Sequence, residues 1–360
     1  MGWQAADVLL LQALPGISGR TVLQIVQQYS DFEHFRHGHA HGALRQFSFF
    51  SASALEDARQ RAATILNRCR QAGIQVVSIA DPEYPELLRH IPYPPVVLYV
   101  RGRFQPNTVP VISIVGTRRC TLYGRLCAER FSEACARAGM VICSGLAQGI
   151  DTIAHQTALR AGGITYAVVA CGLDRIQPTS AARLAAQIVE QGGAVLSEYP
   201  PGTRALPAYF PQRNRIISGL ARAVLVIESG IPGGALITAH FAFDQGRDVY
   251  AVPGNITSDK SAGTNMLIRR QIAIPALSPE ELLADLGMAS ALPAPSTPLF
   301  ASAAEERLYE LLGDEPVHID TLVERAGIPV HEALAHLLEL EFRGLVRQLP
   351  GKYFIRSAPA

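Results

Sequence analysis

Six short apolar runs between residues 109 and 277 constrain the fold of this chain more than any other feature. Each run is rich in β-branched residues and is followed by a stretch with helical spacing; the runs are VPVISIVG, MVICSG, ITYAVVACG, AVLSEYP, AVLVIES and DVYAVPG. Uninterrupted apolar strands are typical of a sheet that is covered on both faces. The alternation of strands and helices therefore predicts a parallel, doubly wound α/β sheet of the extended Rossmann-like kind.

The segments on either side predict two further domains. Residues 1–75 carry apolar residues at helical spacing, and the breaker sequence LPGISGR separates the first two helices. This pattern predicts either a helix-hairpin-helix (SAM-like) domain, whose turn amides can contact phosphate, or an ordinary helical hairpin. A Pro/Ala/Ser-rich linker at residues 289–303 precedes three helices and a hairpin at 304–360, which predict a winged helix. The sheet domain is left with residues 76–288.

The charge of the chain is balanced overall but unevenly distributed. The formal net charge is +1, yet residues 101–223 hold fourteen Arg against six acidic residues, and residues 278–345 hold three Arg against thirteen. Only Lys260 and Lys352 are lysines, so the excess of Arg is equally well explained by a composition bias of the genome. If the uneven charge is instead functional, the basic segment 101–223 predicts a polyanionic partner, and the acidic segment 278–345 predicts a partner of another kind.

Other features bear on the cellular compartment. No apolar run is long enough to cross a bilayer, and the N-terminus lacks a basic region and a cleavage site typical of a signal peptide. The six cysteines are scattered and form no C-x-x-C pair. We therefore expect a cytoplasmic protein whose cysteines are small buried hydrophobic residues.

Doubly wound sheets bind ligands beyond the carboxyl ends of their strands. The first predicted strand ends at Gly116, Thr117 and Arg118, and Gly145 and Gly149 bracket the turn after the second. Glycines at such turns let backbone amides approach an anion, and the helix N-terminus adds partial positive charge. These turns predict an anion-binding edge.

The segment FPQRNRIISGL adds an aromatic ring and two guanidiniums to the same edge. Phe210 offers a face on which a base can stack, and Arg213 and Arg215 flank the amide of Asn214. Guanidiniums pair well with phosphates, and stacked bases on aromatic rings are typical of single-strand binding. The segment therefore predicts the path of a long anionic ligand.

Nucleotide-cofactor motifs are absent. The G-x-G-x-x-G pattern is missing, since GTRRCTLYG has only its first glycine, and no lysine precedes residue 260 to serve a P-loop. The four histidines of HFRHGHAH (His34, His37, His39 and His41) lie in a polar Gly-bearing segment without a nearby cysteine. This predicts a solvated loop rather than a metal site.

Several carboxylates lie near the predicted strand ends, where general acids and bases often occur; they are Asp151, Asp174, Glu198 and Glu228. Asp151 is explained as a charge in the first turn of a helix. Glu198 and Glu228 are candidates for orienting the arginines. A catalytic pair of Asp151 and His155, one helical turn apart, is a less favoured alternative.

The motifs together resemble those of one family. IVGTRRCTLYG, SGLAQGIDTIAH, SEYPPGT, FPQRNRIISGL, GGALITA, VYAVPGNI and GTNMLI occur in one order and spacing. They resemble the DNA-processing protein A family, also called Smf, of bacterial natural transformation. DPEYPELLRHIPYPPVVLYVRG resembles the lead-in to that family's core. The resemblance is strong over residues 81–274 and looser over the N-terminal helices and the winged helix.

The resemblance implies a DNA-binding protein rather than an enzyme, with no catalytic residue, metal or cofactor. Family members bind single-stranded DNA, dimerise, bind the recombinase RecA, and load it onto incoming strands past single-strand-binding protein. Arg118 falls at the pocket arginine of the first turn. The remaining matches fall on the FPxRNR and GTN elements: Phe210, Arg213, Asn214, Arg215, Gly263, Thr264 and Asn265.

This chain departs from the family pattern in places. The segment GLDRIQPTSAARL lacks the usual cation near Thr179, which Arg175 or Arg183 would have to replace. GGALITA replaces SGSLITA, and Gln271 and Ile272 replace Gly-Ala. These changes affect the expected details of the DNA path more than the expected binding.

The predicted winged helix is poorly suited to duplex DNA. Its third helix, PVHEALAHLLELEFRG, carries Glu332, Glu339 and Glu341 against Arg343 alone. Recognition helices that enter DNA grooves are normally basic. A role in protein–protein contact or regulation is therefore expected for this domain.

The alternative function is enzymatic: a nucleoside-monophosphate phosphoribohydrolase of the lysine-decarboxylase-like group, whose signature resembles PGGxGTxxE. Pro232, Gly233 and Gly234 match this signature, but Leu236 replaces the next glycine and His240 replaces the glutamate. The catalytic carboxylate is missing at that position, which disfavours this reading.

Overall fold

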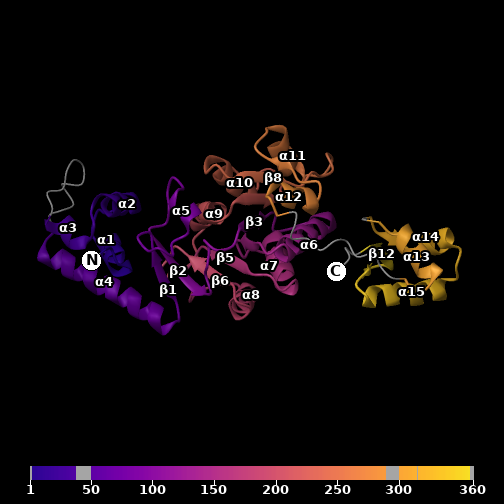
Figure 1. The fold of residues 1–360 in the computed structure, drawn as a ribbon, viewed down its shortest axis with the longest axis horizontal. Helices are drawn as coiled ribbons and strands as arrows, with labels where there is room; N and C mark the ends of the chain where they lie inside the picture. Colours follow the sequence, from indigo (N-terminus) through magenta and orange to yellow (C-terminus); the bar gives the residue numbers. More distant parts are fainter. Residues whose placement is uncertain (1, 38–49, 289–299, 314, 357–360) are drawn as a thin grey trace. The chain divides into compact units, whose positions relative to one another are not determined.

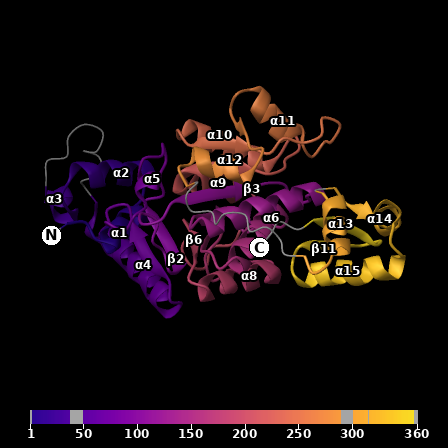
Figure 2. The same ribbon diagram turned by 45° about the vertical axis from the view of Figure 1, so that its right-hand side comes forward.

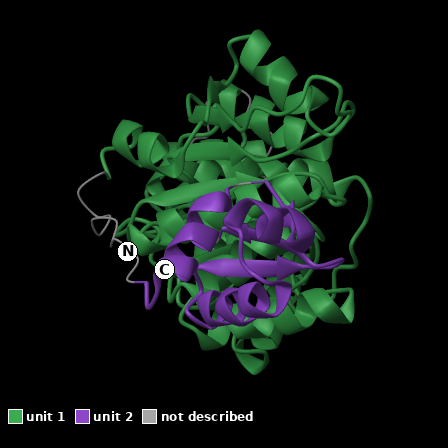
Figure 3. Cartoon of the chain, turned by 90° about the vertical axis from the view of Figure 1, so that its right-hand side faces the viewer, with its two compact units in different colours: residues 1–291 green, residues 292–360 purple. Residues whose placement is uncertain are grey.

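The computed structural model describes residues 2–37, 50–288, 300–313 and 315–356. The chain forms two compact units, Met1–Ala291 and Leu292–Ala360 (Figure 3). Most of the predicted linker at 289–303 lies outside the described residues, so its structure stays a prediction.

A nine-stranded sheet forms the centre of the first unit, in the order β1-β2-β6-β5-β4-β3-β7-β8-β9 (Figure 1). The strands from β6 to β9 in this order run parallel. They are β6 (Ala194–Ser197), β5 (Thr165–Val169), β4 (Val141–Ser144), β3 (Val111–Val115), β7 (Ala223–Val226), β8 (Asp248–Ala251) and β9 (Ile274–Pro275). Every residue of β3 to β7 is buried, as continuous apolar runs require. The predicted doubly wound α/β sheet is confirmed.

Helices cover both faces of this sheet (Figures 1 and 2). Neighbouring helices α6 (Leu122–Arg137), α7 (Ile150–Arg160) and α8 (Thr179–Glu190) pack on one face, and α9 (Tyr209–Leu220) and α10 (Gly234–Asp244) pack together on the other. Right-handed crossovers dictate this arrangement, because the chain reverses its direction across the sheet after β6. The reversal makes β3 and β7 neighbours, and the crevice of a doubly wound sheet opens at such a point.

Two antiparallel strands extend the sheet at one edge, and the sequence analysis did not predict them. β2 (Val97–Gly102) pairs with β6, and β1 (Gln75–Ser78) pairs with β2. The short helix α5 (Glu86–Arg89) lies between them in the chain. The buried Tyr84 hydroxyl donates to the Pro95 carbonyl at 2.6 Å and fixes this connection.

The N-terminal helices pack against this extension. They are α1 (Ala5–Ala13), α2 (Gly19–Gln28), α3 (Phe32–His37) and α4 (Ala52–Gln71). Both α1 and α4 contact β1, and the Ser18 side chain caps α2 by accepting from the Thr21 amide at 3.2 Å. The helical hairpin is therefore present, while a domain boundary at residue 75 stays a prediction.

The first unit ends with α11 (Ala262–Arg269) and α12 (Pro279–Asp285), and α12 packs beside α6. Within the described ranges, no helix combines the length and apolar character needed to cross a bilayer.

The second unit is the predicted winged helix. It contains α13 (Ala303–Leu311), α14 (Ile319–Ala326), α15 (Val330–Phe342) and the hairpin of β11 (Val346–Leu349) and β12 (Tyr353–Arg356). The short strand β10 (Val317–His318) pairs with β12 and completes a three-stranded sheet. Its apolar core is separate from that of the first unit and includes Leu308, Leu322, Leu337 and Phe354.

Candidate functional site

The candidate site lies along the carboxyl edge of the parallel strands. We define the strand-end rim as the loops that follow β3, β4, β6, β7 and β8, together with the first turn of α9. Since α9 connects β6 to β7, its N-terminus lies at this edge, where the helix carries partial positive charge. The rim therefore gathers the loops that the sequence analysis singled out.

The loops after β3 and β4 are packed tightly against each other. The Ile150 amide donates to the Thr117 carbonyl at 3.2 Å. A β-carbon at Gly116 would lie 2.5 Å from Cγ1 of Ile150, and one at Gly149, whose φ is +84°, would lie 2.3 Å from the Thr117 carbonyl oxygen. Both glycines thus permit the close approach of two loops, a role beside the anion contact that the sequence analysis expected.

Arg118 and Phe210 meet at the rim although they are far apart in the sequence. The Arg118 side chain is exposed, and its Cζ lies 5.8 Å from the centroid of the half-buried Phe210 ring. This separation allows a cation–π contact, which keeps the guanidinium over the ring. Arg118 can therefore contact a phosphate of a DNA strand while the adjacent Phe210 ring stacks on a base of the same strand.

Two tyrosines enlarge this aromatic surface, and the sequence analysis missed both. Tyr199 follows β6 and Tyr209 begins α9; their rings stack with centroids 4.2 Å apart and planes at 20°. Both are only half-buried. The signal was present in the sequence, because Tyr199 precedes the turn in SEYPPGT and Tyr209 follows the turn before FPQRNR.

Arg213 lies beneath the rim rather than on it. Its side chain is buried, and Nη1 donates to the Val168 carbonyl at 2.8 Å. The buried Asp151 accepts from the amides of Gly145 and Ala147, at 3.1 and 3.4 Å. Burial raises the pKa of Asp151, and the Arg213 charge opposes that rise. Burial likewise lowers the pKa of Arg213, while Asp151 opposes the change.

Arginine stays protonated in proteins, so Arg213 is a fixed positive charge under the loops after β4 and β5. Its Nε is buried and has no hydrogen-bond partner among the described residues. Asp151 itself holds the loop before α7, consistent with its expected role in the first helical turn.

Arg215 and Asn214 anchor the middle of α9. Arg215 donates to the Tyr93 and Gln212 carbonyls, both at 2.8 Å, and pairs with Glu198. The Asn214 amide donates to the Gly234 carbonyl at 3.3 Å. The expected orientation of an arginine by Glu198 is confirmed, and both side chains of this motif are engaged within the protein.

Glu228 does not orient an arginine but holds the loop after β3. Its two carboxylate oxygens accept from the Thr121 amide and hydroxyl, at 2.8 and 2.7 Å. A pocket of about 320 Å³ opens beside it, at the reversal point of the sheet. The residues that line it carry no cationic side chain: Thr121, Tyr123, Glu228, Gly254, Asn255, Ser258 and Ser261. A phosphate is therefore better met at Arg118 than here.

The GTN element orders the loops after β7 and β8. The Gly263 amide donates to the Ser229 carbonyl at 2.8 Å, and Thr264 is fully buried. The Asn265 side chain accepts from the Gly254 amide and donates to its carbonyl, at 3.1 and 3.0 Å. The element forms the first turn of α11 and packs against the rim, where its hydrogen bonds shape the backbone that a ligand would meet.

The remaining candidates are distributed as follows. Arg175 and Arg183 are both exposed, so either is free to supply the cation that the sequence lacks near Thr179. His155 bonds to Thr165 rather than to Asp151, which separates the proposed catalytic pair. His39 and His41 lie outside the described residues.

Comparisons with known proteins identify the family of the chain. The family model described as DNA recombination-mediator protein A matches residues 75–287, and that of the DprA winged helix domain matches residues 289–352. The protein Smf of Escherichia coli is 41% identical over 284 residues, covering 76% of this chain and 75% of that protein.

Two solved structures share the fold. The crystal structure of DNA processing protein A from Streptococcus pneumoniae superimposes with a TM-score of 0.66 at 33% identity, covering 79% of this chain and 99% of the other. The structure of DNA processing protein A from Helicobacter pylori, which describes a single-stranded DNA binding mode, superimposes with a TM-score of 0.54 at 27% identity. The match covers 59% of this chain and 95% of the other. The chain therefore belongs to the DNA recombination-mediator protein A family.

Proposed function

We propose that this chain binds single-stranded DNA along the strand-end rim and delivers it to a RecA-type recombinase, without itself catalysing a reaction. The observation that carries the proposal is the contact between Arg118 and Phe210, an exposed cation held over an aromatic ring. The Helicobacter pylori protein of this family binds single-stranded DNA, which supports the same class of ligand here.

The rim can meet the two repeating parts of a strand separately. Arg118 offers a guanidinium to a phosphate, and the rings of Phe210, Tyr199 and Tyr209 offer faces to bases. Stacking on aromatic rings tolerates every base, so binding with little sequence preference is expected. The buried Arg213 lies below the rim, where the neighbouring Asp151 carboxylate offsets part of its charge.

The internal hydrogen bonds of the rim lower the cost of binding. Arg215, Asn214 and Asn265 are already held by neighbouring groups, so few side chains must be ordered when the strand arrives. Such preorganisation supports a binding protein, and no step of the proposal requires a proton transfer or a nucleophile.

The test compares Arg118→Ala with Arg119→Ala in fluorescence anisotropy with an oligo-dT strand at several salt concentrations. Both arginines are exposed, but only Arg118 has a recorded contact with Phe210. Losing one phosphate contact should lower the slope of log affinity against log salt by about 0.7. Arg118→Ala should weaken binding more than Arg119→Ala; equal affinities for Arg118→Ala and the unaltered chain would refute the rim assignment.

We also propose that the chain delivers the strand to a recombinase and assembles as a homodimer. Both activities would take place in the cytoplasm. The family description as a recombination mediator supports delivery, and the six free cysteines fit a reducing compartment. The chain should accelerate RecA ATPase activity on strands coated with single-strand-binding protein, and Arg118→Ala should not. Light scattering should give the mass of a dimer.

A further inference from the structure

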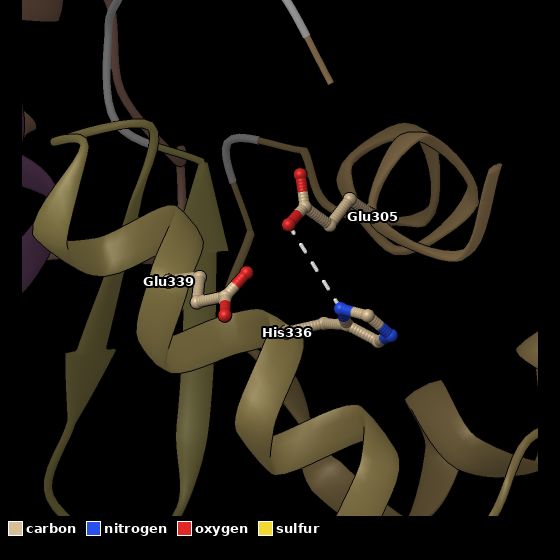
Figure 4. Close-up of side chains that lie close together, drawn as sticks. All are labelled: Glu305, His336 and Glu339. Atoms are coloured by element: carbon tan, nitrogen blue, oxygen red, sulfur yellow. Dashed lines mark ion pairs between the residues drawn. The ribbon is translucent and has the colours of Figure 1, made fainter. Parts of the chain in front are cut away.

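We propose that the winged helix carries a binding site for a divalent transition-metal ion, with Glu305, His336 and Glu339 as its ligands. Glu305 lies in the first turn of α13, and His336 and Glu339 lie one turn apart on α15. One possible ligand atom from each residue lies within 4.8 Å of the other two. Figure 4 shows the three side chains converging from the two helices.

Glu305 presents a carboxylate oxygen that lacks a hydrogen bond. The residue is fully buried, and its Oε2 accepts from the Ala301 amide at 2.9 Å and from Arg343. No group in the described part of the chain donates a hydrogen bond to Oε1. This oxygen points toward His336, with 3.9 Å between it and Nδ1 (Figure 4). A buried carboxylate oxygen that accepts no hydrogen bond is costly, and a bound cation would remove that cost.

His336 has the surroundings that metal-binding histidines usually have. Its other ring nitrogen, Nε2, lies 3.9 Å from Oε1 of Glu332, one turn earlier on the same helix. Histidines that bind metals commonly donate their second N–H to a carboxylate, which fixes the tautomer and orients the ring. Glu332 would thus be a positioning residue and leave Nδ1 free for the ion.

The local charge also matches a divalent ion. Three carboxylates, those of Glu305, Glu332 and Glu339, lie around His336, and Arg343 pairs with Glu305. The carboxylates of this set therefore outnumber the guanidinium three to one. A divalent cation balances them, whereas a phosphate group would be repelled.

The donor set indicates the class of ion. An imidazole with two carboxylates suits Zn²⁺, Mn²⁺ or Fe²⁺ better than Ca²⁺ or Mg²⁺, which prefer oxygen ligands alone. Metal–ligand bonds of about 2.0–2.2 Å put tetrahedral ligand atoms about 3.4 Å apart, so pairs up to 4.8 Å apart must close by up to about 1.4 Å. The exposed Glu339 and half-buried His336 side chains have room to make this shift. The ion would then join α13 to α15.

The experiment titrates Zn²⁺, and separately Mn²⁺, into the full-length metal-free chain by calorimetry. The variants are His336→Gln and Glu339→Gln. His331→Gln is the matched control, because His331 is an exposed histidine on the same helix outside the cluster. All variants keep the N-terminal histidines, so binding there would appear equally in each.

We expect one site that is retained in His331→Gln and weakened at least about tenfold in both ligand variants, a loss of about 1.4 kcal/mol. Zn²⁺ should also raise the melting temperature of the unaltered chain and of His331→Gln, but not of His336→Gln. Unchanged affinity in His336→Gln and Glu339→Gln, or no binding up to millimolar Zn²⁺, would overturn the proposal. Since Glu339 is exposed, Glu339→Gln keeps the test valid if His336→Gln unfolds. Loss in the ligand variants and the control alike would also refute it.

Discussion

The guanidinium of Arg213 packs directly against the backbone of Gly145 beneath the strand-end rim. A β-carbon at residue 145 would lie 1.9 Å from Nη1 of Arg213 and 2.8 Å from Oδ2 of Asp151. Nη1 also donates to the Val168 carbonyl at 2.8 Å, so the guanidinium cannot withdraw without losing that bond. Glycine at this position thus allows a buried charge to lie under the loop after β4.

Gly145→Ala should therefore destabilise the protein. Forcing atoms into a packed interior typically costs about 1–3 kcal/mol, and displacing Arg213 from its carbonyl adds to this. Chemical denaturation measures the free energy of unfolding. Gly234→Ala is the matched control, because a β-carbon there meets nothing within 4 Å, and its effect should stay within about 0.5 kcal/mol. Equal stability of the two variants would show that the loop accommodates a side chain freely.

Phe210→Ala should weaken binding to oligo-dT at every salt concentration. Removing one stacking ring usually costs about 1–3 kcal/mol per base, and the variant also removes the ring that faces Arg118. Anisotropy titrations should show little change in the salt slope, because no phosphate contact is lost. Phe210→Tyr keeps the aromatic face and should bind nearly as well as the unaltered chain. If Phe210→Ala binds equally well, bases do not stack at this ring.

The sequence predicts the sheet more completely than the site, and the reason is physical. Apolar runs report burial directly, so each of the six became a strand, whereas Gln75–Ser78 was too short to show a period and was missed. Arg213 and Arg215 look alike in the motif, yet one is buried and the other is tied to Tyr93 and Glu198. Helical spacing gave a hint, since Arg213 shares a face with the buried Ile216, Ile217 and Leu220.

Contacts between distant loops could not be inferred in this way. Nothing in the spacing of Thr121 and Glu228 shows that they bond across the reversal point of the sheet. The same holds for Asn265, whose side chain brackets Gly254. Gly116 and Gly149 were read only as room for an anion, whereas the structure shows that their β-carbon positions face a neighbouring loop. The sequence motifs identify which edge of the sheet holds the site. The contacts of each residue there depend on tertiary packing, which the motifs do not show.

Acid should destabilise the protein through His155. The Thr165 hydroxyl donates to the Ile142 carbonyl at 2.6 Å, so it accepts from Nδ1 of His155, and the buried Nε2 has no partner among the described residues. Burial, with the Arg213 charge as a second cause, lowers the pKa of His155 from 6.5 to about 3. The unfolded chain therefore binds more protons between these values. Stability should fall by up to about 1.4 kcal/mol per pH unit as the pH drops through this window.

The measurement is the free energy of unfolding at several pH values from 7 to 4. His155→Gln should lower stability at pH 7 but flatten the dependence on pH, because the titrating group is gone. His240→Gln, which changes an exposed histidine, should keep the slope of the unaltered chain. Parallel curves for His155→Gln and the unaltered chain would mean that other groups govern the acid response.

A chain that ends at residue 288 should keep most of its affinity for single-stranded DNA. The first compact unit, Met1–Ala291, contains every loop of the strand-end rim, and the winged helix has a hydrophobic core of its own. The third helix of that domain, α15, carries the exposed Glu332 and Glu339 and the half-buried Glu341, which would repel phosphates rather than bind them. Anisotropy with oligo-dT should therefore show an affinity within about threefold of that of the full chain. This corresponds to a change of less than about 0.7 kcal/mol in the binding free energy. A loss of about tenfold or more would instead give the winged helix a direct part in strand binding.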